Sequence, residues 1–227
     1  FDVLAVTPTA QGTEDSGRWE RFRTASSKLA SMLDAIQQTL ATSEVVEAEF
    51  SDSLIRQIQQ TAEDSLREYA PGTDFSLGLF GWTAAEDEDW GPVWSSSGAS
   101  REDWLWAGKT VVSEFEDWQQ GHSLAGSTTD LADRGVIAND LAENLLRVDA
   151  QGVAVRPVRV PNGTGKLLPC LAFVGLSSDV AFFADDLVRR LVEQTISLLE
   201  VVIAIGRRDE ILLRRLAGRR GVSGKEF

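Results

Sequence analysis

Tryptophan is the residue type in this sequence with the clearest potential for binding chemistry. Seven Trp occur in 227 residues, and six of them lie between Trp82 and Trp118. Aromatic walls with a few polar groups suit a planar small molecule, but the same side chains also fill cores and interfaces, which is the interpretation we favour for the whole set. If a pocket exists, we expect Phe80, Trp82, Trp94 and Trp104 to line it, because the three Trp lie near predicted strand ends or the start of a helix.

Residues for catalysis or metal binding are sparse. His122 is the single histidine and Cys170 the single cysteine, so neither a Ser-His-Asp set nor a cysteine pair is evident. Four consecutive acids at 86–89 lack the spacing of a calcium loop and favour a solvated turn, and GTGK lacks the remaining residues of a phosphate loop. The sequence therefore predicts no enzyme activity, no metal and no cofactor. A lone cysteine excludes an internal disulfide and favours the cytoplasm.

Charge is distributed unevenly along the chain. The formal net charge is -13, and residues 44–117 hold 17 acids against 4 bases, whereas residues 205–227 hold 7 bases against 3 acids. The acidic part should repel nucleic acid and anionic membrane, and it could serve a basic protein partner. The longest apolar run, ISLLEVVIAIG, is too short to span a bilayer, so we expect a soluble chain without membrane contact. Because the sequence begins at Phe1 rather than Met, we expect a piece of a longer protein.

The stretch from Leu168 onward organises the rest of the chain. LAFVGL predicts a buried strand over 168–176, followed by a long helix capped by Ser178 or Asp179 and reaching Leu216. Apolar residues recur in this helix at alternating steps of four and three, which is the spacing of a coiled-coil seam. The seam comprises Ala184, Val188, Leu191, Thr195, Leu198, Val202, Ile205, Asp209, Leu212 and Leu216. A second stripe through Phe183, Leu187, Ile196 and Ile203 widens the apolar face, so that one side covers the sheet and the other meets a second helix.

A second seam lies near the amino terminus, in a helix that Asp15 or Ser16 is expected to cap. Its members are Trp19, Phe22, Ser26, Leu29, Leu33, Ile36 and Leu40. Two such helices would suit a homodimer, and the alternative is that they pack on each other inside a monomer. We favour the homodimer, with Leu29, Leu33, Ile36, Leu191, Leu198 and Val202 as its contact residues.

The segments between the two seams predict a mixture of helices and strands. A helix capped at 51–53 should end at Pro71-Gly72, before an aromatic strand FSLGLFGW and a short strand at 92–96. A helix should start after Ser100, and 122–135 is expected to be a loop. Residues 111–118 could continue the helix or form a strand. Asn139 should cap a short helix, and the PNGTGK turn should join a strand at 152–160, with an edge or bulge at Pro157, to the strand at 168–176.

A strand that ends in small polar residues, then the acidic Phe-containing start AFFADD and a long apolar helix, resembles the carboxyl-terminal signature of GAF domains. The element order also resembles that family. The resemblance implies an α/β (α+β) fold, GAF/PAS-like, with a central antiparallel sheet of about five to six strands and long terminal helices. It divides the chain into a lead-in and heptad helix at 1–50, a GAF-like domain at 51–205 and a basic helical extension at 206–227.

The resemblance also carries functional expectations. Family members that bind haem or bilins need a pocket histidine, or a cysteine beside a histidine, and neither pattern is present here; the signature of cyclic-nucleotide binders is absent too. The function that we favour is a regulatory sensor that binds an unknown small molecule in an aromatic pocket and signals through its terminal helices in a dimer. The alternative is a ligand-free dimerisation or protein-interaction module of the same fold.

Overall fold

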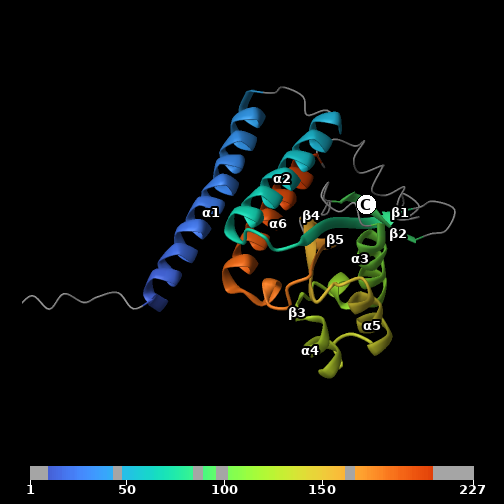
Figure 1. Ribbon diagram of the computed structural model, residues 1–227. Helices are drawn as coiled ribbons and strands as arrows, with labels where there is room; N and C mark the ends of the chain where they lie inside the picture. The colour runs from blue at the N-terminus through green and yellow to red at the C-terminus, as the bar shows by residue number, and fades with distance from the viewer. Residues whose placement is uncertain (1–9, 43–47, 84–88, 96–101, 162–166, 207–227) are drawn as a thin grey trace, which may run out of the picture.

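The computed structural model describes residues 10–42, 48–83, 89–95, 102–161 and 167–206. Its centre is a five-stranded sheet, shown in Figure 1, in which all neighbouring strands are antiparallel. The spatial order is β2 (Asp89–Ser95), β1 (Phe75–Thr83), β5 (Leu167–Ser177), β4 (Gly152–Pro161) and β3 (Leu124–Ser127). The expected fold class, a central antiparallel sheet flanked by helices, is confirmed.

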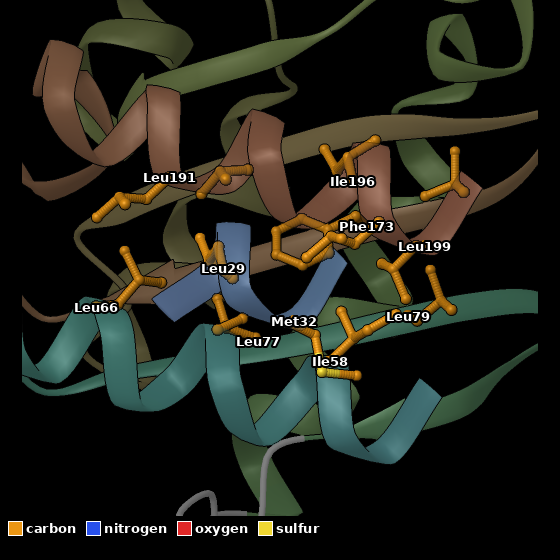
Figure 2. Packing of buried hydrophobic residues seen from close by; sticks show 14 of the residues in the cluster. Leu29, Met32, Ile58, Leu66, Leu77, Leu79, Phe173, Leu191, Ile196 and Leu199 are labelled. Atoms are coloured by element: carbon orange, nitrogen blue, oxygen red, sulfur yellow. The ribbon is translucent and has the colours of Figure 1, made fainter. Parts of the chain in front are cut away.

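Three long helices cover one face of the sheet. They are α1 (Ala10–Thr42), α2 (Ala48–Tyr69) and α6 (Asp186–Gly206), and each of them packs against the other two. Figure 1 shows α1 and α2 as an antiparallel pair beside α6. Their apolar faces meet residues of β1, β4 and β5 in one buried cluster, part of which appears in Figure 2. The last helix therefore contacts both the sheet and other helices, as its widened apolar face predicted, and those helices belong to the same chain.

Shorter helices cover the opposite face. They are α3 (Glu102–Glu114), the 3-10 helix η1 (Glu116–Gln120), α4 (Thr128–Asp133) and α5 (Asn139–Arg147). Strand residues alternate between the two clusters: Leu77 and Leu79 of β1 belong to the long-helix side, and Phe80 belongs to the short-helix side. A sheet covered on both faces needs apolar residues at successive positions, which explains why FSLGLF shows no polar alternation.

The expectation of a loop at 122–135 was wrong. This stretch contains β3 and α4, and the Ser127 side chain caps α4 by accepting a hydrogen bond of 3.3 Å from the Asp130 backbone N–H. β3 has only four residues, two of them Ala and Gly, so its sequence carries little strand signal. β3 is stabilised instead by its antiparallel pairing with β4. The undecided stretch is also helical: its first residues belong to α3, which ends at Glu114, and η1 begins at Glu116.

Several predicted helix starts were also wrong. α1 begins at Ala10 rather than after Asp15 or Ser16, and α2 begins at Ala48, before the proposed caps at 51–53. α5 has Ala138 rather than Asn139 at its cap position. The expected end of the last helix at Leu216 lies outside the described residues. The same holds for the last three seam residues, Asp209, Leu212 and Leu216.

The strand-to-helix corner after β5 is longer than expected. A 3-10 helix η2 (Phe182–Ala184) precedes α6, so Ala184 lies before that helix and Asp185 caps it, not Ser178 or Asp179. The physical reason is aromatic packing. A Cβ on Gly175 would lie 2.4 Å from the Phe183 ring, so this ring packs directly on the β5 backbone, and Phe182 stacks on Phe75 with ring centroids 5.3 Å apart.

The predicted turns near the strands are confirmed where the structure describes them. Gly72 lies between α2 and β1 and has a φ of +88°. Glycine adopts this backbone conformation without steric cost. The β4–β5 register shifts between Val158 and Arg159, next to Pro157, as a bulge there predicts. The PNGTGK turn residues 162–166 lie outside the described part, and the two strands they join are antiparallel neighbours.

Candidate functional site

The aromatic residues on the short-helix side form a packed core. Phe80, Trp104 and Trp118 are all buried there. The Trp104 indole N–H donates to the Val148 carbonyl at 2.7 Å, and the Trp118 indole N–H donates to the Val112 carbonyl at 3.1 Å. Buried indoles need such partners, so both rings are held by their own chain.

Phe80 lies in very close contact with two glycines. A Cβ on Gly78 would lie 2.6 Å from the ring, and one on Gly108 of α3 would lie 2.8 Å from it. The backbones of β1 and α3 therefore both pack closely against the same edge of the Phe80 ring. No planar ligand fits between this edge and either backbone.

Trp82 and Trp94, the other expected pocket residues, lie on β1 and β2. Register places Trp82 opposite Trp90 and Trp94 opposite Leu79. Their side chains fall outside the described part of the chain, so the pocket role of Trp82 and Trp94 stays a prediction.

The residues expected to form a dimer seam are buried within one chain. Leu29, Ile36, Leu191, Leu198 and Val202 are at most 4% exposed and belong to the long-helix cluster, and Leu33 packs against it. Figure 2 shows Leu29 and Leu191 within this cluster. The monomer alternative accounts for this burial. A homodimer stays a prediction, and in this arrangement it would have to use other residues.

A polar junction connects the three long helices where α1 crosses the start of α6. The Arg18 guanidinium lies 2.5 Å from the Asp185 carboxylate and donates to the Tyr69 hydroxyl at 3.1 Å. The Tyr69 hydroxyl donates to the same carboxylate oxygen, Oδ2, at 2.9 Å. In addition, Arg21 Nε donates to the Tyr69 carbonyl at 3.0 Å.

Asp185 has a second role at the same place. Its other oxygen, Oδ1, accepts hydrogen bonds from the backbone N–H groups of Leu187 at 2.7 Å and Val188 at 3.4 Å. These groups belong to the first turn of α6, where backbone donors lack partners within the helix. One carboxylate therefore caps α6 and binds α1 and α2. We call Arg18, Tyr69 and Asp185 the helix junction.

The electrostatics of the helix junction favour this pattern. Burial raises the pKa of the Tyr69 phenol, so it stays neutral and can donate to Asp185 at ordinary pH. The hydrogen bond with Tyr69, and after it the nearby charges, raise the pKa of Arg18, which stays positive. The arrangement holds one full charge pair and one neutral donor at the crossing of three helices.

No local sequence pattern indicates this junction. Arg18 and Asp185 are 167 residues apart in the sequence, and Tyr69 lies on a third helix. A usable signal exists for Asp185 alone, because an Asp immediately before an apolar helical run is a common cap.

The remaining candidate residues have local roles. His122 is exposed after η1. Arg156 pairs with Glu193 at 3.4 Å, and the Arg159 guanidinium donates to the Gly121 carbonyl at 3.0 Å. Among the described residues, no three or more His, Cys, Asp or Glu side chains gather as a metal site would require. No helix in the described ranges has the length and apolar character to cross a membrane.

Comparison with solved structures identifies the fold. The phycocyanobilin-bound GAF domain from a cyanobacterial phytochrome matches 82% of this chain and 96% of its own, with a TM-score of 0.51 and 15% identity. GAF3 from Slr1393 of Synechocystis sp. PCC6803 in its photoproduct state matches 70% and 98%, with a TM-score of 0.46 and 18% identity. The red/green cyanobacteriochrome NpR6012g4 in its red light-absorbing state matches 68% and 96%, with a TM-score of 0.45 and 12% identity.

No protein-family model matches the chain, and comparison with curated proteins finds no match. The chain has a GAF-like fold, with helices on both faces of an antiparallel sheet. At 15% identity the similarity concerns the fold alone.

Proposed function

We propose that the protein is a regulatory module whose helix junction couples the position of α1 to the start of α6, so that a signal at one helix changes the other. The observation that carries this proposal is the double use of Asp185, whose two oxygens serve α6 on one side and Arg18 and Tyr69 on the other. A change that moves α1 acts directly on the carboxylate that caps α6.

The energy of the junction suits a switch. The Arg18 and Asp185 side chains are 46% and 21% exposed, so their pair contributes only a modest part of the stability. A cap contributes about 1 kcal/mol. Interactions of this size can be exchanged by a ligand or partner that prefers one of two arrangements.

Hydrogen exchange tests the coupling. In Arg18→Met the Asp185 carboxylate loses its cationic partner, and we expect faster exchange both in α1 and in the first turn of α6, where Leu187 and Val188 donate to it. Arg134→Met, at an exposed arginine after α4, is the control. Faster exchange in α1 with unchanged exchange in α6 would contradict the proposal.

A small-molecule input is the second candidate. The observation in its favour is the number of Trp at one edge of the sheet: Trp82, Trp90 and Trp94 lie on β1 and β2, and Trp106 of neighbouring α3 is 52% exposed. Native mass spectrometry of gently purified protein would detect a retained ligand as extra mass. Protein at the mass of the bare chain, with no fluorescence change on adding planar aromatic compounds, would count against this candidate.

Homodimerisation through the helical layer is part of the same proposal. Val201 of α6 is 38% exposed, whereas neighbouring Val202 is 1% exposed. Val201→Glu should therefore dissociate a dimer that uses this face and leave each chain folded, as judged by native mass spectrometry and circular dichroism. A dimer that survives the change would exclude the outer face of α6 as its interface.

A further inference from the structure

An open groove of about 500 Å³ lies beside the helix junction. α1 contributes one wall, and the corner of η2 and α6 contributes the other. Its lining residues are Arg18, Trp19, Ala181, Ala184 and the run Asp185–Leu187. The volume is within the range of sites that hold small ligands or single side chains.

Trp19 is the most unusual residue of this groove. It is 51% exposed, although an indole is among the side chains that gain most from burial. Its ring meets Phe22 edge to face, with centroids 5.7 Å apart, so the α1 surface itself supports it. Exposed, supported aromatic rings are common anchors of protein interfaces.

The charged residues that line the groove favour a cationic ligand. Asp185 and Asp186 face one cation, Arg18, which is already paired with Asp185. Asp186 has a 75% exposed side chain, and among the residues that the structure describes it pairs with Arg189 of its own helix, an exposed contact that contributes little and exchanges easily. The groove therefore offers an available carboxylate beside an indole ring, within a chain of net charge -13.

We infer that this groove binds an arginine side chain of a basic protein segment. The guanidinium stacks on Trp19 and pairs with Asp186, and its aliphatic stem lies along Ala181 and Ala184. Arginine fits better than lysine because its planar group stacks on an aromatic face and binds a carboxylate with two parallel hydrogen bonds. A second guanidinium next to Asp185 competes with Arg18 and loosens α1. This last step rests on the proposed function, and the binding site itself does not.

Fluorescence anisotropy with the full chain tests the site. The probe is a fluorescein-labelled peptide, RRLAGRRGVSGK, which is the sequence of residues 214–225. Trp19→Ala and Asp186→Asn should each weaken binding about tenfold. The matched controls are Trp106→Ala, another half-exposed Trp, and Asp140→Asn, another carboxylate in the first turn of a helix. Both should bind like the unchanged protein, and binding should weaken with salt.

Three other outcomes would contradict this binding site. Equal affinity in all variants would place the peptide elsewhere on the acidic surface, and no detectable binding would remove the site. Arginine amide that binds as tightly as the peptide would make the groove a small-cation site. A spin-label distance between α1 and α6 separates the two proposals: peptide binding that depends on Trp19 but leaves the distance unchanged supports the groove and contradicts the coupling.

Discussion

Arg18 of α1 and Asp185 at the start of α6 are 167 residues apart in the sequence, yet their charged groups lie 2.5 Å apart. Tyr69 of α2 binds both of them. This polar contact adds to the apolar packing through which α1, α2 and α6 already contact one another.

The two roles of Asp185 should be separable by mutation. Asn caps helices about as well as Asp, so Asp185→Asn should remove mainly the charge pair and cost about 0.5–1 kcal/mol of unfolding free energy. Asp185→Ala removes the cap as well, and we expect a cost of about 2 kcal/mol. Urea denaturation measures both. In a protein that already carries Arg18→Met, Asp185→Asn should remove almost no further unfolding free energy. If the losses of unfolding free energy from the two changes simply add, the two side chains do not act as a pair.

Two helical glycines should respond to alanine with opposite signs. Gly17 has space, because an added Cβ would meet only Arg21 at 3.7 Å, so Gly17→Ala should stabilise the protein by about 0.5–1 kcal/mol. Gly108→Ala would place its Cβ 2.8 Å from the Phe80 ring and should destabilise it by about 1–3 kcal/mol. Thermal denaturation by circular dichroism distinguishes them. A harmless Gly108→Ala would mean that space exists beside Phe80, which would favour a ligand there.

Trp104 should behave as a core residue. Trp104→Phe removes the indole N–H that binds the Val148 carbonyl at 2.7 Å and leaves a smaller ring, so a loss of about 1–3 kcal/mol is expected. Exposed Trp106→Phe is the control, with a change below about 0.5 kcal/mol. Equal, small effects at both positions, measured by chemical denaturation, would show that Trp104 does not hold α3 to the turn after α5.

Glu63 of α2 should give the stability a dependence on pH. It is 2% exposed, and burial raises its pKa above the usual 4.5, although Gln59 donates a hydrogen bond of 3.0 Å to it. The folded state thus binds the proton more tightly than the unfolded state. The stabilisation is complete below the unfolded pKa and is lost as pH rises through the folded pKa. Compared with Glu63→Gln, the unchanged protein should lose stability as the pH rises from below the usual pKa of glutamate through the raised pKa of Glu63. Parallel stability curves for the two proteins would contradict this.

The fold was predictable from sequence where local signals were strong. The apolar runs of β1 and β5, the glycine after α2 and the periodic residues of α2 and α6 each indicate one element. β3 could not be predicted, because four weakly apolar residues form a strand only through pairing with β4. The corner at Phe182 and Phe183 depends on the surface of Gly175 and Phe75, which no local pattern encodes.

The candidate site was less predictable than the fold. Heptad spacing identified Leu29 and Leu198 as helix contacts but could not distinguish a partner in the same chain from one in another. The helix junction joins residues from three separate helices, and long-range polar contacts leave no periodic signal. Trp19 was assigned to an apolar seam, whereas in the structure it is half exposed at a groove.

Pulsed dipolar spectroscopy between spin labels on α1 and α6 tests the coupling of these helices most directly. Ala30→Cys and Ser197→Cys provide exposed label sites, in a background with Cys170→Ala so that no other thiol reacts. We predict one narrow distance distribution for the otherwise unchanged protein, and a broadened or second distribution when Asp185→Asn is added. Asp140→Asn should leave the distribution narrow. An identical distribution with and without the Asp185 change would contradict the claim that this carboxylate sets the arrangement of the two helices.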